Sequence, residues 1–409
     1  MKTNFVKLRW LFTMLLFVTT MIMPTMMLAK SIDLKIPEGD GAGTPYKIGT
    51  AEELYWFAGL VNGTLPGVKK DLSANAILTD DIIVNTGVLD PNKDLVSGND
   101  FIEWIPIGKS SSDDDAYTGT FDGNGHTISG LYFNKSNSWY VGLFGCIGAE
   151  GKISNVGVSD SYFQSSNCPY IGGVCGSNSG ELQNCSNSST VIGKENEYRI
   201  GGVCGYNSGT VKDCKNTGSV RGKETIGGVC GNNSGTIKNC YNTASVSGQY
   251  SVGGVCGDNY EGPITNCYYL SGTVADGKGG IGGKDDENGK AVEMSKDRFK
   301  SGEVAWLLNG SKSVSTEEST LAWYQKLGEN ADAYPVLKST DHNTVYKAPL
   351  FSCDGTTRIG EYANKPEGDK LSHNYQMEEK ADEGTSNLYS EECAICHNVK
   401  DGTKYIKDF

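Results

Sequence analysis

One short pattern of apolar and polar positions recurs along the middle of the chain. Four segments begin with Gly-Gly-Val-Cys-Gly, at residues 172, 201, 227 and 253, and a degenerate earlier copy reads VGLFGCIGAEGKISNV at 141–156. The first cysteines of the four segments fall at 175, 204, 230 and 256, which gives steps of 29, 26 and 26 residues. A unit of this length cannot bury a core alone, but copies stacked on one another can.

Aliphatic side chains return at fixed positions of each copy. β-Branched residues and leucines in register suit strands that pair with the next copy about 4.8 Å away. No unit holds a stretch of 3.6-residue periodicity longer than one turn, which excludes helical repeats. The pattern predicts an all-β fold: a right-handed parallel β-solenoid over 141–275, with an α/β N-terminal cap and a small C-terminal module. The three columns are Val141, Ile171, Ile200, Ile226 and Val252; Leu143, Val174, Val203, Val229 and Val255; and Ile153, Leu182, Val211, Ile237 and Ile264.

An asparagine returns three residues after the first cysteine of each copy. Asparagine tolerates the left-handed backbone of a turn, and stacked side-chain amides can bond to each other. We therefore predict a structural ladder of Asn178, Asn207, Asn233 and Asn259.

Eight cysteines form two further columns. In the degenerate copy Phe144 and Val156 occupy the two equivalent places, which is typical of apolar inward positions, where a free cysteine behaves as a small hydrophobe. This favours unbonded structural ladders. Disulfides within or between turns are the alternative in an exported protein, whereas evenly repeated single thiols do not make a four-ligand zinc cluster. The columns are Cys175, Cys204, Cys230 and Cys256, and Cys185, Cys214, Cys240 and Cys267.

Residues 30–140 are predicted to form the N-terminal cap. Thr50-Ala51-Glu52-Glu53 is a capping box before apolar residues at helical spacing, and Asn62-Gly63 is a stop signal, so a helix is expected between them. ANAILTDDIIVN (74–85) alternates like one strand, and YTGTFDGNGHTISGLYF (117–133) predicts two strands hinged on its Asp-Gly-Asn-Gly turn. Together these elements would cover the unpaired strand edges at one end of the solenoid.

Residues 276–345 are predicted to hold a linker and a C-terminal cap. The Gly-rich charged stretch 275–290 reads as a linker or loop, and MSKDRFKSGEVAWLLNG (294–310) indicates a pair of short amphipathic helices. The aromatic residues of 321–339 suit a cover for the other end of the solenoid. Residues 346–409 are polar and poor in aliphatic side chains, which indicates a small tail module or partial disorder.

The first 29 residues are predicted to be a cleaved signal peptide. Lys2, Lys7 and Arg9 precede a long apolar stretch that ends at Ala29, and Pro24 favours cleavage over an uncleaved membrane anchor. No later apolar run is long enough to span a bilayer, so the expected location is secreted or on the cell surface. Asp and Glu (49) outnumber Lys and Arg (36), a net charge of −13, which argues against a nucleic-acid-binding surface.

The repeat, (I/V)GG-V-C-G-x-N-x-G-x-(I/V)-x-(N/D)-C, resembles the GLUG motif of secreted bacterial proteins. YTGTFDGNGHTISGL, SGEVAWLLNG and WYQKLGENADAYPVL are similar to segments that accompany it in gut-bacterial surface proteins, so the resemblance covers about residues 44–345. It implies a β-solenoid in an exported, often adhesin-like protein. Some proteins with this motif carry a metallopeptidase, as the immunoglobulin A peptidases do, but no histidine here is followed by the Glu and second His of a zinc-peptidase helix. The family supplies no motif-borne catalytic residue.

The tail carries one motif with metal chemistry. Cys393-Ala394-Ile395-Cys396-His397 matches the C-x-x-C-H pattern of covalent haem attachment, but only 409 − 397 = 12 residues follow it, too few to wrap a haem. Cys353, His373, Cys393 and Cys396 could instead supply four tetrahedral zinc ligands, with His397 as an alternative ligand. A disulfide between Cys393 and Cys396, or thiols without a function, are the other interpretations. Apart from this structural zinc, no cofactor is expected.

These observations favour a non-catalytic binding or adhesion protein that presents a polar face to a glycan or a host protein. Tyr206, Tyr241, Tyr268 and Tyr269 are candidate contact residues, because aromatic rings stack on sugars and anchor proteins, although strand propensity alone also explains them. The alternative is a polysaccharide lyase or hydrolase, which needs several ionisable side chains converging in a groove. Asp122 and His126 form the most enzyme-like pair, but their turn-forming sequence gives them a structural role, so no catalytic residue is predicted.

Overall fold

The computed structural model describes most of the chain after the predicted signal peptide, and residues 1–31 lie outside the described part. Side chains are described for 32–98, 100–110, 114–167, 169–194, 198–275, 278–282, 290–311, 321–328, 330–337, 342–353, 358–365 and 368–371. The backbone alone is described for 375–380, 388–393 and 399–406.

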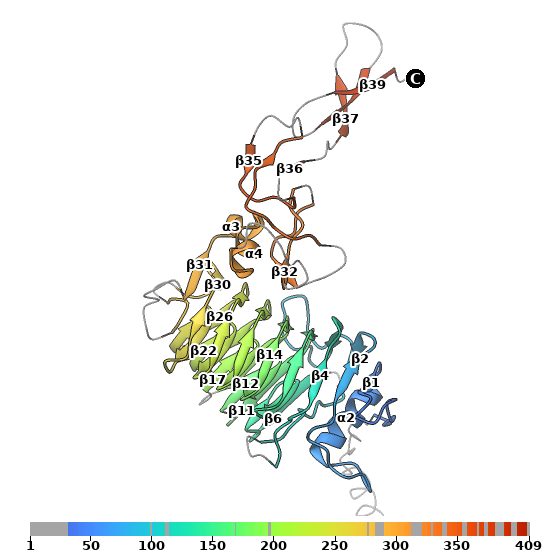
Figure 1. The fold of residues 1–409 in the computed structure, drawn as a ribbon, viewed down its shortest axis with the longest axis vertical. Coiled ribbons are helices and arrows are strands. Elements are labelled where there is room, and N and C mark those ends of the chain that lie inside the picture. Colours follow the sequence, from blue (N-terminus) through green and yellow to red (C-terminus); the bar gives the residue numbers. More distant parts are fainter. Residues whose placement is uncertain are drawn as a thin grey trace, which may run out of the picture.

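The chain winds into a parallel β-solenoid of about seven turns, which confirms the predicted fold class (Figure 1). A complete turn passes through five strands, and the strands of successive turns pair in parallel to build five sheets. We number the sheets in the order in which one turn visits them. Sheets 1 to 3 have five strands each, and sheets 4 and 5 have eight.

The strands of each sheet are as follows. Sheet 1 holds β6 (Tyr132–Ser136), β11 (Tyr162–Ser166), β16 (Thr190–Lys194), β21 (Val220–Arg221) and β26 (Val246–Ser247). Sheet 2 holds β7 (Tyr140–Val141), β12 (Tyr170–Gly172), β17 (Tyr198–Gly201), β22 (Glu224–Gly227) and β27 (Tyr250–Gly253). Sheet 3 holds β8 (Phe144–Ile147), β13 (Cys175–Asn178), β18 (Cys204–Asn207), β23 (Cys230–Asn233) and β28 (Cys256–Asn259).

The two longer sheets reach further toward both ends of the solenoid. Sheet 4 holds β1 (Tyr46–Ile48), β2 (Ala76–Leu78), β4 (Thr120–Asp122), β9 (Lys152–Ser154), β14 (Glu181–Gln183), β19 (Thr210–Lys212), β24 (Thr236–Lys238) and β29 (Ile264–Thr265). Sheet 5 holds β3 (Ile82–Ile83), β5 (Thr127–Ser129), β10 (Gly157–Ser159), β15 (Ser186–Asn187), β20 (Lys215–Asn216), β25 (Tyr241–Asn242), β30 (Cys267–Leu270) and β31 (Ala291–Met294).

The predicted columns stack in register along the solenoid axis and form one core. Cys175, Cys204, Cys230 and Cys256 face one another as consecutive register partners, and all are fully buried. Both cysteine columns consist of free thiols, as the unbonded interpretation predicted. Desolvation in this core raises the pKa of the Cys204, Cys230 and Cys256 thiols.

The predicted asparagine ladder is present, and a second one runs beside it. Asn178, Asn207 and Asn233 each donate from Nδ2 to Oδ1 of the asparagine of the next turn, at 2.8 Å, and the last acceptor is Asn259. In sheet 5 the same 2.8 Å bonds link Asn187 to Asn216 and Asn216 to Asn242. We call these two series the inner ladders. They satisfy polar groups that would otherwise be orphaned in the core.

The glycine after the first cysteine of each copy lies where the backbones of sheets 2 and 3 approach each other. A Cβ on Gly205 would lie 2.7 Å from the backbone nitrogen of Ile171, and one on Gly231 would lie 2.4 Å from the backbone carbonyl carbon of Arg199. No side chain fits in this space, which explains why the motif has glycine there.

The N-terminal cap contains the predicted helix. Helix α2 (Ala51–Asn62) begins where the Thr50 hydroxyl accepts a hydrogen bond from the Glu53 backbone nitrogen, and it ends at Gly63, which has a φ of 64°. Its buried face packs on the first turns of the solenoid, with Phe57 6.0 Å from the Phe121 ring. The helix covers one end of the core, as expected.

One detail of the predicted cap is wrong. The single strand expected at 74–85 is two strands, β2 and β3, because the polar Thr79–Asp81 stretch turns the chain at a solenoid corner into another sheet. The two strands predicted on either side of the Asp-Gly-Asn-Gly turn are present as β4 and β5, which belong to sheets 4 and 5 and pair with neighbouring turns of the solenoid. Sheet 4 therefore starts at β1, well before residue 141.

The C-terminal cap packs against the outer side of sheet 5. The predicted helix pair is present as α3 (Lys296–Lys300) and α4 (Glu303–Leu308), and β32 (Trp323–Tyr324) pairs with β33 (Val336–Leu337). The Tyr241 ring lies 5.2 Å from Trp323 and 5.7 Å from Phe299. Beyond the cap lie β34 (Leu350–Phe351), β35 (Arg358–Gly360), β36 (Asp369–Lys370), β37 (Tyr375–Lys380), β38 (Leu388–Cys393) and β39 (Val399–Ile406). No helix in the described part of the chain has the length and apolar character needed to cross a membrane.

A third polar series runs along the corner between sheets 4 and 5, and one aspartate interrupts it. Asn155, Asn184, Asp213, Asn239 and Asn266 all have φ between 51° and 54°. Asn184 donates to Asn155, and Asn239 donates to Asp213, each at 2.9 Å. Buried Oδ1 of Asn184 has no partner, because a carboxylate at 213 cannot donate as an asparagine would. We call this series the corner column.

Replacing Asp213 by asparagine is expected to stabilise the protein by about 1 kcal/mol at pH 7, because the new amide can donate to Asn184. Desolvation raises the Asp213 pKa above its ordinary 3.8, so above pH 4 the folded state holds a proton that the unfolded chain releases. Stability of the parent protein should therefore fall as pH rises from about 4 through the raised pKa. Urea midpoints measured from pH 4 to pH 8 should show this decline in the parent and not in D213N; equal profiles would contradict the assignment.

Candidate functional site

The four tyrosines predicted to contact a ligand do not share one surface. Tyr241, Tyr268 and Tyr269 are 0 %, 6 % and 4 % exposed, which corrects the expectation that they face solvent. The C-terminal cap and the core cover them, and the Tyr241 hydroxyl donates to the Pro335 carbonyl. Tyr206 alone is partly exposed, and it belongs to the surface described below.

Of the four predicted zinc ligands, the structure describes the side chain of Cys353 alone. Cys353 is buried, while the side chains of His373, Cys393 and Cys396, and that of His397, lie outside the described residues. Among the side chains that are described, no group of three or more His, Cys, Asp or Glu is placed to hold a metal ion. The tail zinc site stays a prediction.

Asp122 and His126 serve the solenoid corner. The Asp122 carboxylate accepts hydrogen bonds from the Asn124 backbone nitrogen and from Asn155 Nδ2, both at 2.9 Å. His126 Nδ1 lies 3.4 Å from an Asp81 carboxylate oxygen. These contacts fit the structural role expected of the pair.

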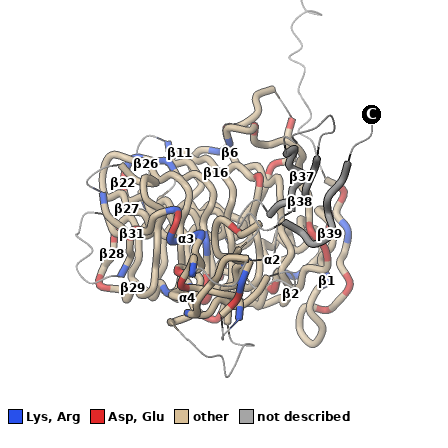
Figure 2. Tube along the Cα trace, turned by 90° about the horizontal axis from the view of Figure 1, so that it is seen from above, with Lys and Arg blue, Asp and Glu red and all other residues tan. Residues whose placement is uncertain are grey.

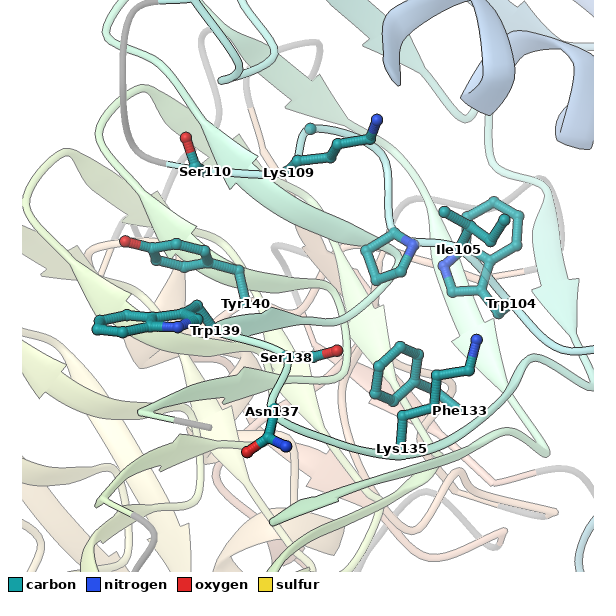
Figure 3. A pocket seen from close by; sticks show the side chains of 12 residues that line it. Trp104, Ile105, Lys109, Ser110, Phe133, Lys135, Asn137, Ser138, Trp139 and Tyr140 are labelled. Carbon is teal, nitrogen blue, oxygen red and sulfur yellow. The ribbon is translucent and has the colours of Figure 1, made fainter. Parts of the chain in front are cut away.

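A groove of about 680 Å³ lies between the segment 104–110 and the β6–β7 connection. Trp139 and Tyr140 lie on one side of it, and Trp104, Ile105 and Phe133 lie on the other (Figure 3). Trp139 is 65 % exposed, an unusually open position for a tryptophan. Lys109, Ser110, Lys135, Asn137 and Ser138 supply polar groups around these apolar walls. Apolar walls with a few polar groups are typical of a small-molecule or sugar site.

Hydrogen bonds and one ion pair hold the walls of the groove in place. Trp104 is fully buried, and its indole nitrogen donates to the Gly142 carbonyl at 3.0 Å. Lys109 Nζ donates to the Asn62 carbonyl at 2.7 Å, and Lys135 forms a 2.7 Å ion pair with Glu103. Since these anchors come from the cap helix, the 104–110 segment and the solenoid, the groove is shaped by all three.

A row of stacked side chains continues from the groove along the solenoid axis. Tyr140, which lines the groove, stacks on Tyr170 of the next turn with the ring centroids 5.0 Å apart and the planes at 7°. The Tyr206 ring follows, 5.8 Å from that of Tyr170. The Arg199 guanidinium carbon lies 5.1 Å from the Tyr170 ring centroid and 5.9 Å from that of Tyr206. We call Tyr140, Tyr170, Arg199 and Tyr206 the ledge.

The sequence contains a signal for this surface besides Tyr206. Tyr140 and Tyr170 each stand directly before the first aliphatic column, at Val141 and Ile171, so their rings fall in register. The exposed Trp139 precedes the first of them. The groove itself was not predictable, because residues 104–110 come from outside the repeat.

The fold and this surface define a β-solenoid repeat protein with an aromatic groove and ledge on one side. Residues 196–221 match the family described as the GLUG motif, which confirms the resemblance seen in the repeat.

Two curated proteins are similar to part of the chain. Halomucin of Haloquadratum walsbyi is 38 % identical over 84 residues, which are 20 % of this chain and 1 % of halomucin. A protein of Evansella cellulosilytica named as a Gly-rich membrane protein is 33 % identical over 78 residues, which are 19 % of this chain and 9 % of that protein. The chain thus spans less than a tenth of either relative. No solved structure matches it.

Proposed function

We propose that the protein is exported and acts as a binding or adhesion protein, with the groove and the ledge as its site for a carbohydrate chain. The observation that carries this proposal is the continuous aromatic surface from exposed Trp139 through the parallel Tyr140–Tyr170 pair. The predicted signal peptide and the membrane-protein name of one relative support a location outside the cytoplasm.

Carbohydrate suits this surface better than a second protein chain. Sugar rings have apolar faces that stack on aromatic rings and hydroxyl edges that need polar partners, and the groove offers both. The Tyr140 and Tyr170 rings of two successive turns lie 5.0 Å apart, about one strand spacing, which is close to the length of one sugar unit in an extended polysaccharide.

Binding is also favoured over the enzymatic alternative. The groove-lining residues that the structure describes include no carboxylate and no imidazole. Glycoside hydrolysis ordinarily uses a pair of carboxyl groups across the scissile bond. An assay for new reducing ends or unsaturated products, run on each glycan that binds, tests the alternative directly.

Replacing Trp139 by alanine is expected to weaken glycan binding tenfold or more, because it removes the exposed aromatic face on one wall of the groove, and tryptophan is a frequent hot-spot residue. The purified chain from residue 30 onward would be screened on a glycan array, and each positive glycan titrated by calorimetry. Y260A is the matched control, since Tyr260 is 60 % exposed but does not line the groove. The proposal would be overturned if no glycan bound, or if W139A and Y260A lost glycan affinity equally. It would also be overturned, in favour of protein adhesion, if the chain bound host proteins and no glycan.

A further inference from the structure

Arg199 is the one cation of the ledge, and its surroundings are unusual. Its guanidinium lies within 6 Å of three tyrosine rings, those of Tyr170, Tyr198 and Tyr206. No ion pair among the described residues involves it, although the described carboxylates elsewhere pair with Lys and Arg repeatedly. A guanidinium held between aromatic faces keeps its N–H edge available for an acceptor.

The repeat fixes the position of this side chain. Arg199, Thr225 and Ser251 occupy the same register in sheet 2 and share a left-handed backbone, with φ of 66°, 57° and 47°. Tyr140 and Tyr170 precede them in the column. The left-handed backbone is therefore shared by these three turns and absent at Tyr140 and Tyr170, and Arg199 is the cation among the three.

The charge on this side of the molecule contrasts with the whole chain. The protein carries a net charge of −13, and its charged residues are scattered over the turns without one continuous stretch (Figure 2). Lys109, Lys135 and Arg199 nevertheless border the groove and the ledge, and the described carboxylates beside them are Glu103, which pairs with Lys135, and Glu224, the register partner of Tyr198. The surface thus suits an anionic ligand.

We infer that the ledge binds an acidic polysaccharide, with the Arg199 guanidinium receiving the carboxylate of a uronic acid unit that lies against the outer edge of the ledge. This inference rests on the proposed carbohydrate function and names the ligand class. The planar fork of a guanidinium matches a carboxylate through two parallel N–H···O bonds, which a neutral sugar cannot accept with the same strength. The polymer runs along the solenoid axis, with neighbouring units beside Tyr140 and in the groove.

The test compares acidic oligosaccharides with their own neutral forms. Oligomers of polygalacturonate, alginate and hyaluronan would each be titrated into the purified chain beside the carboxyl-reduced oligomer, which keeps the linkages and loses the charge. We expect at least one acidic oligomer to bind ten times more tightly than its reduced form, and its affinity to fall as salt rises. In R199Q the acidic oligomer and its reduced form should bind with similar affinity, so that the preference disappears, and R199K should retain part of it.

Controls separate this inference from the proposed function. Arg221 pairs with Asp94 at 2.9 Å on sheet 1, outside the ledge, so R221Q should bind like the parent. Circular dichroism and the urea midpoint establish that each variant is folded. Neutral glycans that bind and depend on Trp139, with no acidic preference, would overturn the inference and leave the proposed function standing. Failure of every acidic and neutral glycan would overturn both.

Discussion

Replacing Asn207 by aspartate is expected to destabilise the protein by about 3–5 kcal/mol at pH 7, because it buries a charge that nothing compensates. Asn207 is fully buried, and its Nδ2 donates to Asn233 Oδ1 at 2.8 Å and to the Gly209 and Thr236 carbonyls. A carboxylate would place an oxygen against these three acceptors. Urea unfolding followed by circular dichroism would measure the loss.

The pH dependence of this variant identifies the cause. Burial among acceptors raises the pKa of the introduced carboxyl, so protonation near pH 4 should restore a donor and recover part of the stability. N167D is the control, since exposed Asn167 bonds its neighbour Asn137 at 3.2 Å on the surface, and its effect should stay within about 0.5 kcal/mol. Equal effects of the two substitutions would mean that the inner ladder does not support the core.

Replacing Phe144 by alanine is expected to cost about 3–5 kcal/mol, the usual loss for a large aromatic side chain removed from a core. Phe144 is fully buried, and its ring centroid lies 5.4 Å from Tyr117 and 5.3 Å from Phe121. It stands at the place of the first cysteine column, where it joins the solenoid core to the cap. The shift in the urea midpoint would measure the effect.

A second substitution at position 144 tests whether the large side chain there is needed for the repeat itself or for packing against the cap. F144C restores the residue that the other four copies carry, yet it should lose most of the stability that F144A loses, because the space between Tyr117 and Phe121 needs a ring. C204A, which removes a single sulfur from the same column, should cost clearly less. A neutral F144C would show that cap packing does not depend on this ring.

The solenoid and its core were predictable from the sequence because every turn buries side chains of the same kind at the same positions of the repeat. Positions that must be apolar, such as those of Val203 and Val229, occupy the same place in every copy of the repeat. Four copies are enough to identify these positions from the sequence alone. The Asn207 ladder was predictable for the same reason. Outside the repeat, local patterns gave a wrong prediction. The alternation of apolar and polar residues at 74–85 is the same for one straight strand as for two short strands, β2 and β3, that are separated by a corner.

The candidate site was less predictable, because it depends on which face of a strand is covered. Tyr241 and Tyr206 look alike in the sequence, but the C-terminal cap buries Tyr241 and leaves Tyr206 partly open. That difference arises from a contact between residues almost a hundred positions apart, with Tyr241 beside Pro335. The groove likewise brings Trp104 and Trp139 together through the cap, which no repeat pattern encodes.

The side-chain hydrogen bonds of the asparagine series have a fixed direction along the solenoid axis, which matters when the number of turns changes. In both inner ladders each side chain donates toward the C-terminal end, whereas in the corner column Asn184 and Asn266 donate toward the N-terminal end. The side-chain dipoles of the two kinds of series therefore point in opposite directions and partly cancel. Adding or deleting one turn therefore changes the side-chain dipole along the solenoid axis less than it would if only the inner ladders were present. Solenoids with different numbers of turns should thus have similar side-chain dipoles.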